Sequence, residues 1–373
     1  MRVSTLDLAN FRNYAALHVE PPSGVCVFIG DNAQGKSNLL EAISLLATGK
    51  SFRAAREADL VRTDCPLARV AARVTTAHAE VQAACIITRV GDGARIRFVR
   101  NGRGVAYAQF LGGINAVTFM PLDLQLIAGP PAIRRRFLNV ALSQADREYY
   151  RQHARYTGIL AQKNALLKAA AGVDRKLLAT YNEQLAAVGT SLIGARAAYV
   201  RGLARKAADV HARWVGDVPQ LRMQYVPSPA LPEGDESPGA VLRAIAVAWE
   251  THSTAELARK TSLVGPHRDD ILFALGDQAL GRFGSQGQQR TAVLAVKSAE
   301  YALLAAAAGE PPLLLLDDVL SELDAERRRS FMSSIEGCEQ AFVTATELPD
   351  LIAGSAVSVF EINGGRLAAR AST

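Results

Sequence analysis

Residues 25–38 decide the fold of this chain, and they read Val25-Cys26-Val27-Phe28-Ile29-Gly30-Asp31-Asn32-Ala33-Gln34-Gly35-Lys36-Ser37-Asn38. The continuous apolar run at 25–29 predicts a strand that is buried on both faces of a sheet. Residues 30–37 match the phosphate-loop pattern Gly-x-x-x-x-Gly-Lys-Ser/Thr without deviation. Apolar residues at helical spacing then predict a helix from residue 36 to about residue 48. A strand, this loop and a helix in that order predict an α/β domain that binds phosphate groups.

The residue types of this loop suit the phosphates of a nucleotide. Glycines let backbone N–H groups come close to phosphate oxygens, and the N-terminus of the helix adds partial positive charge. Lys36 can reach the β- and γ-phosphates, and Ser37 can ligate Mg²⁺. We therefore expect ATP and Mg²⁺ here, with contacts from Gly30, Asp31, Asn32, Ala33, Gln34, Gly35, Lys36 and Ser37. The alternative is a Gly-rich turn that only connects a strand to a helix.

A second buried strand is predicted at 313–316, and it is followed by the acidic pair Asp317-Asp318. Two carboxylates at this place resemble a Walker B motif, in which Asp317 holds Mg²⁺ and Asp318 polarises the attacking water. The predicted catalytic residues are thus Lys36, Asp317 and Asp318, and the predicted metal ligands are Ser37 and Asp317. Helix capping is the alternative role of the pair. The run continues to Asp324, as in the ABC class of ATPases, where the last aspartate lies across a dimer interface.

A third motif lies roughly 30 residues before the acidic pair and reads Ser285-Gln286-Gly287-Gln288-Gln289-Arg290, ahead of an apolar helix predicted at 291–308. A serine at a helix start with a glycine beside it is an anion-binding element. The motif resembles the ABC signature loop, which in that class binds the γ-phosphate held by a second subunit. We therefore expect Ser285, Gly287 and Gln288 to contact the ATP of a second copy. Taken alone, Ser285 is a plain helix N-cap.

The middle of the chain differs from both ends. From 141 to 215, twelve Lys/Arg and five Asp/Glu give a net charge of +7, whereas the whole chain carries +6. A polyanionic partner and solvated helix faces explain such an excess equally well. Apolar residues recur every three or four positions at 156–167 and 177–203, which predicts two long helices in an antiparallel hairpin. The expected organisation is an α/β ATPase domain made of residues 1–140 and 251–373, with a helical arm at 141–250.

Other elements are predicted from alternation and turn residues. They are strands at 3–8, 81–88, 95–100 and 340–344, with a turn at Asn101-Gly102, and helices that start near 240 and span 325 to about 335.

The composition excludes several classes of protein. With 373 residues, 49% hydrophobic and 21% charged, the chain suits about two globular domains and is not disordered. Its four cysteines form no Cys-x-x-Cys pair, so we expect buried thiols and neither a disulfide scaffold nor a zinc site. The N-terminus lacks an apolar run, and no stretch of 18 residues is apolar without a charge. We therefore expect a cytoplasmic protein with no membrane partner.

The three motifs in this order, with a short arm between them, resemble the RecF family of recombination-repair ATPases, which is related to SMC heads. The resemblance covers almost the whole chain. Besides the phosphate loop and the run 316–324, it rests on Asn10-Phe11-Arg12-Asn13-Tyr14, Lys50-Ser51-Phe52-Arg53, Arg134-Arg135-Arg136-Phe137-Leu138, Gly265-Pro266-His267-Arg268-Asp269-Asp270 and Ser285-Gln286-Gly287-Gln288-Gln289-Arg290. The block at 265–270 and the short arm are far more particular than the phosphate loop.

The resemblance implies a P-loop fold of the ABC and SMC-head type and a weak, DNA-dependent ATPase. It implies that Arg12 and Asn38 contact the nucleotide and that Asp324 acts across a homodimer formed on ATP binding. It also implies double-stranded and gapped DNA, RecO and RecR as partners, with recognition of single-strand/double-strand junctions and help in loading RecA recombinase. The family has an acidic residue after the proline of its γ-phosphate sensor loop, where this chain has Leu122. We expect the sensor of this chain to be Asp123 or Gln125.

Several further residues have more than one possible role. His267 is a structural residue, a lobe contact or a catalytic group. The basic residues Lys50, Arg53 and Arg56 touch phosphates or are solvated, and one of Arg134, Arg135 and Arg136 faces phosphate while the others are solvated. Thr346 replaces the switch histidine of ABC proteins, or a threonine at this strand end caps the chain.

Two other function classes share the phosphate loop. A nucleotide-binding subunit of a transporter carries the same three motifs, but its helical subdomain is small and docks on a membrane partner. A metabolic P-loop kinase needs a substrate pocket and has no use for the motif at 285–289. Stimulation of ATP hydrolysis by gapped duplex DNA, by a membrane partner or by a small acceptor distinguishes the three classes.

Overall fold

The chain divides into two compact units. The computed structural model describes residues 1–170, 172–216, 219–232, 235–320, 323, 325–334, 337–348 and 357–370. Unit 1 comprises Met1–Asp123 and Lys297–Thr373, and unit 2 comprises Leu124–Val296. The N- and C-terminal parts thus form one α/β unit around an inserted segment, which confirms the expected fold class. The finer limits of the arm, at 141 and 250, stay a prediction.

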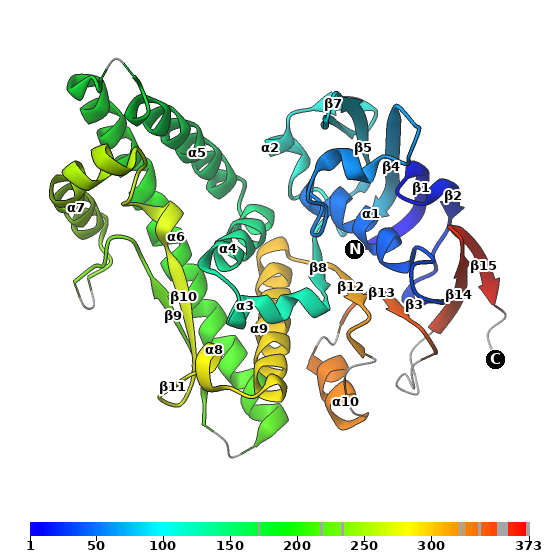
Figure 1. Ribbon diagram of the computed structural model, residues 1–373. Coiled ribbons are helices and arrows are strands. Elements are labelled where there is room, and N and C mark those ends of the chain that lie inside the picture. Colours follow the sequence, from blue (N-terminus) through cyan, green and yellow to red (C-terminus); the bar gives the residue numbers. More distant parts are fainter. Residues whose placement is uncertain are drawn as a thin grey trace. The chain divides into compact units, whose positions relative to one another are not determined.

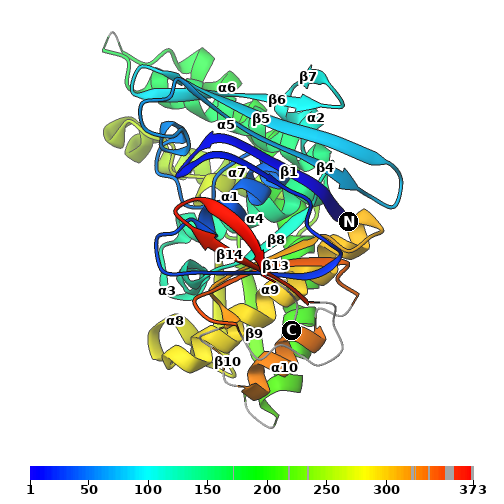
Figure 2. The same cartoon turned by 90° about the vertical axis from the view of Figure 1, so that its right-hand side faces the viewer.

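Unit 1 contains an antiparallel sheet with the strand order β2-β1-β4-β5-β6-β7 (Figure 2). Its strands are β1 (Arg2–Phe11), β2 (Tyr14–Val19), β4 (Leu67–Thr75), β5 (Glu80–Val90), β6 (Gly93–Arg100) and β7 (Arg103–Val105). The turn between β6 and β7 is the predicted Asn101-Gly102, and both residues have positive φ (49° and 75°), as a tight hairpin turn requires. The strand β2 was not predicted, because hydrophobic and polar residues alternate only weakly in this short segment. It pairs with β1 through the turn at Arg12-Asn13.

A second sheet of unit 1 carries the phosphate loop and has the order β15-β14-β3-β13-β12-β8. Its strands are β3 (Gly24–Ile29), β8 (Ala116–Phe119), β12 (Leu313–Asp317), β13 (Gln340–Ala345), β14 (Val357–Asn363) and β15 (Arg366–Arg370). The strands β3, β13, β12 and β8 are mutually parallel neighbours. Every residue of β12 and β13 is buried, which explains their continuous apolar runs. Their carboxyl ends meet at one edge, where ligands of parallel sheets bind.

The helix α1 (Lys36–Thr48) belongs to the core of unit 1. Ten of its 13 residues are buried, and its apolar side chains join one cluster with residues of both sheets, such as Leu6 of β1 and Phe28 of β3. It ends at Gly49, whose φ of 65° is left-handed and suits a helix C-cap. Because both sheets pack on this helix, the loop that opens it is fixed on a rigid support. Short helices of the same unit are η1 (Glu57–Leu60), α2 (Tyr107–Phe110) and α10 (Ala325–Ser334), with η2 (Pro121–Leu124) at its edge.

Unit 2 is mainly helical. Its helices are α3 (Gln125–Ala128), α4 (Pro131–Ala145), α5 (Arg147–Leu167), α6 (Arg175–Val215), α7 (Pro238–Arg259), η3 (Pro266–Arg268) and α8 (Leu280–Phe283), and its sheet has the order β11-β10-β9. The sheet strands are β9 (Leu221–Val226), β10 (Asp270–Leu275) and β11 (Gln278–Ala279). Helices α5 and α6 lie side by side, as the apolar stripes predicted (Figure 1). The Asp174 side chain caps α6 by accepting from the N–H groups of Lys176 and Leu177.

The helix α9 (Gln286–Ala308) begins five residues before the predicted start at residue 291. The reason is a capping box, in which the Gln288 N–H donates to Ser285 Oγ at 3.2 Å and the Ser285 N–H donates to Gln288 Oε1 at 2.8 Å. Most of the signature-like motif is therefore helical and is not a loop. By length and composition α9 could cross a membrane, but most of its apolar stretch is buried inside the protein, as in a core helix.

The four cysteines are free thiols, as expected, but only two are buried. Burial raises the pKa of Cys26 to about 12 and raises that of Cys85 as well. Cys65 and Cys338 are half-buried, which corrects the expectation of four buried thiols.

Candidate nucleotide-binding site

The phosphate loop leaves the carboxyl end of β3 and needs glycine at both ends. Gly30 has a φ of +150°, and a Cβ there would lie 2.4 Å from the carbonyl oxygen of Ile362. Gly35 has a φ of +120°, and a Cβ there would lie 2.6 Å from the side-chain nitrogen of Asn13. Both positions therefore exclude any side chain. The loop is packed against β14 on one side and against the turn between β1 and β2 on the other.

The ammonium group of Lys36 folds back under this loop. Its Nζ donates to the carbonyl oxygens of Gly30 at 2.5 Å and Asp31 at 2.9 Å, and the residue is only 7% exposed. A cation held inside a curved backbone with glycines at both ends fits the phosphates of a nucleotide. Lys36 thus lies at the inner side of the loop, and its contact with phosphates stays a prediction.

The remaining loop residues differ in their surroundings. Asp31, Asn32 and Ala33 are exposed at the tip. Gln34 is held in place, because its Oε1 accepts from the Gly364 N–H at 2.7 Å and its carbonyl oxygen accepts from the Gly365 N–H at 3.1 Å. The turn between β14 and β15 therefore fixes the tip from outside.

The carboxylate of Asp317 meets two hydroxyl groups at the end of β12. Its Oδ1 accepts from Ser37 Oγ at 2.7 Å and from Thr344 Oγ1 at 2.8 Å. The parallel register pairs Asp317 with Thr344 of β13 and pairs Thr344 with Phe28 of β3. A hydroxyl and a carboxylate side by side at the phosphate loop are oxygen ligands of the kind that Mg²⁺ prefers. The donor set thus fits Mg²⁺, with Ser37 and Asp317 as the residues that would hold it.

The sequence pattern predicts Thr344 only as the end of a strand and assigns it no role at this site. The Thr344 hydroxyl also accepts from the Asp318 N–H at 3.0 Å, so one side chain orients both aspartates. Thr344 lies near the carboxyl end of β13, the strand beside β12, and this position could have predicted a role near Asp317. Asp318 has a φ of +55°, a left-handed conformation that is uncommon outside glycine and is found most often at asparagine and aspartate.

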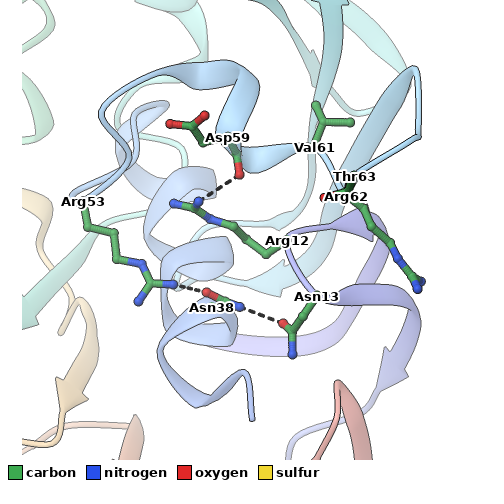
Figure 3. Close-up of a pocket in the computed structure, with 8 residues that line it drawn as sticks. All are labelled: Arg12, Asn13, Asn38, Arg53, Asp59, Val61, Arg62 and Thr63. Atoms are coloured by element: carbon green, nitrogen blue, oxygen red, sulfur yellow. Dashed lines mark hydrogen bonds between the residues drawn. The ribbon is translucent and has the colours of Figure 1, made fainter. Parts of the chain in front are cut away.

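A pocket of about 530 Å³ lies beside the phosphate loop and is lined by Arg12 and Asn38, the two residues that the family resemblance assigned to the nucleotide (Figure 3). Asn38 Nδ2 donates to Asn13 Oδ1 at 2.7 Å. Asn13 in turn donates to the carbonyl oxygen of Gln34 at 2.8 Å. This chain of bonds links the pocket wall to the loop.

The signature-like residues lie in unit 2, whereas the phosphate loop and the acidic pair lie in unit 1. Ser285, Gln286, Gly287 and Gln288 are exposed at the first turn of α9. Gln289 anchors this turn, because its Nε2 lies 3.2 Å from the carbonyl oxygens of both Leu280 and Gly284. The exposed N-terminus of a helix of this length can meet an anion on another molecule.

Four further residues were predicted from the family resemblance. Asp324 lies outside the described residues. Of the two sensor candidates, Asp123 accepts from the Met120 N–H at 2.9 Å, and burial raises its pKa to about 6. Gln125 is exposed at the start of α3. Thr346 is exposed just after β13.

Of the three arginines at 134–136, Arg134 and Arg135 pair with residues of unit 2 and are neither phosphate ligands nor fully solvated, whereas Arg136 is exposed. Arg134 is buried and donates through Nε and Nη2 to the carboxylate of Asp270, at 2.5 and 3.0 Å. Arg135 donates to the carbonyl oxygen of Asp269 at 2.9 Å. Arg134 can be buried because the carboxylate of Asp270 neutralises its charge. The two residues are 136 positions apart in the chain, so the sequence around Arg134 does not predict this pairing.

Of the other basic candidates, Lys50 is exposed, whereas Arg53 and Arg56 contact carboxylates. Arg53 Nε donates to Glu41 at 3.2 Å, and Arg56 contacts Asp59 at 3.3 Å. His267 packs inside unit 2, where its ring nitrogens lie 2.8 Å from the Tyr156 hydroxyl and 3.2 Å from the Ser262 carbonyl oxygen. Burial lowers the pKa of His267 to about 4, so the ring is neutral near pH 7. The contacts of His267 thus lie inside unit 2 and support a structural role for this residue.

Comparison with known proteins agrees with this geometry. The family model described as "RecF/RecN/SMC N terminal domain" matches residues 2–361. The DNA replication and repair protein RecF of Symbiobacterium thermophilum is 41% identical over 94% of this chain and 93% of its own length. RecF of Thermosynechococcus vestitus is 39% identical over 100% and 98%.

Solved structures show the same likeness. The recombination mediator protein RecF with ATP, from the RecFOR pathway, is 30% identical, with a TM-score of 0.91 over 99% of this chain and 97% of that one. An Smc head domain of Pyrococcus furiosus is 17% identical with a TM-score of 0.54, which concerns the fold alone. The ABC and SMC-head type of fold is thereby confirmed. By its sequence over nearly the full length and by its fold, the chain belongs to the RecF family.

Proposed function

We propose that this chain is an ATP-dependent DNA-binding protein of recombinational repair and replication restart. It binds ATP with Mg²⁺, forms a homodimer, recognises single-strand/double-strand junctions in duplex and gapped DNA, and hydrolyses ATP slowly when DNA is bound. With RecO and RecR it helps to load RecA recombinase in the cytoplasm. Membership of the RecF family supports this reading, because those relatives are named as DNA replication and repair proteins and as a recombination mediator with ATP.

The main observation in support of this proposal is that the side chains of Ser37, Asp317 and Thr344 meet beside Lys36. Lys36 supplies a fixed positive charge for the β- and γ-phosphates. Bound Mg²⁺ would neutralise charge on the same phosphates during hydrolysis. The Asp318 carboxylate orients and polarises the attacking water as a general base. These roles need no movement of the strands, because the register of β3, β13 and β12 already brings the groups together.

The second half of the proposed site comes from another copy. Ser285, Gly287 and Gln288 form an exposed helix N-terminus that suits the γ-phosphate of a partner's ATP, and Asp324 acts at the same interface. ATP then holds two copies together, and loss of the γ-phosphate releases them.

The first prediction is that dimerisation depends on ATP and on both halves of this site. Lys36→Met should abolish ATP binding and with it the dimer, because the phosphates lose their buried cation. Ser285→Arg should bind ATP like the unchanged protein but remain monomeric, since a bulky side chain blocks the partner's phosphate. Sedimentation velocity with and without ATP measures both.

The control for the second variant is Ser253→Arg, an exposed serine of α7 in the same unit. It makes the same chemical change away from the proposed interface and should dimerise normally with ATP. A dimer that forms without nucleotide and persists in both test variants contradicts the split site.

The second prediction concerns DNA. Binding mainly through phosphates makes affinity fall steeply with salt, by about 10³–10⁵ between 50 and 200 mM when six to ten phosphates are contacted. Two duplexes of unrelated sequence should bind equally, because phosphate contacts carry no sequence information. Titrations of both duplexes across a salt series provide the measurement. A flat salt response, or a strong preference for one sequence, is incompatible with the proposal.

The transporter-subunit alternative receives no support from the comparisons, whose relatives are RecF proteins over nearly their full length. The long basic helices α5 and α6 also differ from a small membrane-docking subdomain.

A further inference from the structure

Two arginines near the phosphate loop share one buried carboxylate, that of Glu41 in α1, which is 0% exposed. Glu41 Oε1 accepts from Arg12 Nη2 at 2.8 Å, and Oε2 accepts from Arg12 Nε at 2.9 Å. Arg53 Nε donates to Oε2 at 3.2 Å, and the Ser51 hydroxyl donates to Oε1. One carboxylate thus links the turn between β1 and β2, the helix α1 and the segment that follows α1.

A carboxylate at this position is not explained by stability alone. Burying a charge is costly, and well-packed apolar residues often replace buried ion pairs without loss of stability. The neighbours of Glu41 in α1, Leu40 and Ala42, are apolar core residues. The two arginines, by contrast, remain 18% and 34% exposed. The charge of Glu41 therefore acts on groups that reach the surface.

Both guanidinium groups line the pocket in Figure 3. A guanidinium has five N–H donors. Arg12 uses three of them, on Glu41 and on the carbonyl oxygen of Asp59, and Arg53 uses two, on Glu41 and Asn38. Counting partners only within the described residues, two donors of Arg12 and three of Arg53 remain for a ligand.

The chemistry of this pocket favours an anion. The charged cluster at the pocket comprises three arginines (Arg12, Arg53 and Arg62) and two carboxylates (Asp59 and the buried Glu41), so its net charge is +1. Because Asn38 directly follows Ser37 and Asn13 binds the loop at Gln34, the cluster lies next to the proposed phosphate site. Planar guanidinium groups at fixed spacing recognise phosphate oxygens by paired hydrogen bonds.

We propose that Glu41 is a positioning residue for ATP turnover. It holds Arg12 and Arg53 in fixed orientations on the pocket wall, so that their remaining donors face phosphate oxygens of the nucleotide at the neighbouring loop. Glu41 itself touches no nucleotide and acts through the two arginines. This inference rests on the proposed binding and hydrolysis of ATP.

The variant Glu41→Gln distinguishes two roles for Glu41, namely positioning of the arginines and a purely electrostatic effect on ATP. The substitution keeps the size of the side chain and raises the net charge of the cluster from +1 to +2. Electrostatics alone then predicts tighter ATP binding and unchanged turnover. Positioning predicts slower turnover, because the amide has one acceptor oxygen and its NH₂ group faces a guanidinium. We expect an ATP dissociation constant that is equal or lower and a turnover that falls about 10- to 100-fold, the scale of a misplacement of about 1 Å.

A double-mutant cycle tests the route of the effect. Glu41→Gln, Arg53→Gln and the double variant are compared for ATP hydrolysis without DNA and for ATP affinity. Because Glu41 acts through the arginines, the double variant should be no slower than the slower single variant. If the two fold-changes in turnover multiply, the two residues act independently and the inference is overturned. The inference is also overturned if the two substitutions are coupled only in their effect on DNA affinity, because the arginines then contact DNA phosphates and not those of ATP.

Two further variants keep the test decisive. Glu57→Gln, an exposed glutamate of η1, makes the same charge change and should leave turnover unchanged. If Glu41→Gln does not fold, as judged by circular dichroism, Arg53→Lys replaces it. Lysine keeps the charge but lacks the fork that contacts Glu41 and Asn38, so turnover should fall about tenfold at unchanged ATP affinity. Unchanged turnover in Arg53→Lys overturns the inference. Failure of the unsubstituted protein to bind or hydrolyse ATP would instead refute the proposed function.

Discussion

Asp318→Asn is expected to slow ATP hydrolysis about 10²- to 10⁴-fold while ATP still binds, the usual scale for loss of a general base. Asparagine keeps the size of the side chain but loses the charge that polarises water. The fold at this position should persist, because asparagine tolerates the left-handed backbone of Asp318 (φ +55°), and the N–H bond to Thr344 is retained. The closed dimer should then remain on DNA, since the γ-phosphate is not lost.

Asp317→Asn should give the opposite result on DNA. Asp317 Oδ1 accepts from both Ser37 and Thr344, so the substitution removes the anionic acceptor of two hydroxyl groups and the proposed ligand of Mg²⁺. Binding of Mg²⁺ and ATP should weaken, and with it dimerisation. One variant is therefore trapped on DNA and the other is released.

The dimer lifetime on gapped duplex DNA, followed after dilution into excess competitor, distinguishes the two variants. Asp92→Asn, at the exposed turn between β5 and β6, controls for loss of one carboxylate in the same unit and should keep a near-normal lifetime. Equal lifetimes for Asp317→Asn and Asp318→Asn would mean that the two aspartates do not have the separate roles assigned to them.

The parts of this site that a sequence reveals are those that depend on local pattern. The buried strands β3 and β12 appear as continuous apolar runs, and the loop between β3 and α1 has an ordered set of glycines and a lysine. Thr344 and Glu41 were not predicted as site residues, because each is a polar residue within a mostly apolar stretch. Their roles arise from strand register and from ion pairs with distant segments, which no local pattern encodes.

The start of α9 shows a different limit. Its first residues are polar and include Gly287, so apolar periodicity placed the start at residue 291. The pairing of Ser285 with Gln288 is a capping signal that periodicity does not contain. The burial of Arg134 was not predicted, for a related reason. Arginines in a row usually indicate a solvated surface, but a buried arginine needs only one carboxylate such as Asp270, wherever it lies in the chain.

The block at 265–270 should be one of the most sensitive parts of unit 2. Asp269 is 0% exposed and Arg196 is 2% exposed, and their side chains meet at 2.7 Å. Asp269 also accepts from the Tyr225 hydroxyl and, at 2.8 Å, from the Ser228 N–H. Burial raises the pKa of Asp269, so its charged form depends on these partners.

Asp269→Ala is therefore expected to destabilise unit 2 by about 3–5 kcal/mol, because it leaves Arg196 buried without its counter-charge. Asp277→Ala is the matched control, since it removes an aspartate whose partner Arg222 and whose own side chain (97% exposed) lie at the surface. That variant should keep the denaturation midpoint of the unchanged protein, as exposed pairs contribute little. Both tryptophans, Trp214 and Trp249, lie in unit 2, so their fluorescence during denaturant unfolding reports on this unit directly.

The double variant Asp269→Ala with Arg196→Met distinguishes loss of the counter-charge from loss of packing. Methionine removes the buried cation but keeps much of the side-chain volume, so the double variant should be more stable than Asp269→Ala alone. If both are equally destabilised, packing and not charge dominates at this position. A midpoint for Asp269→Ala that matches the Asp277→Ala control would show that the buried pair does not support unit 2 at all.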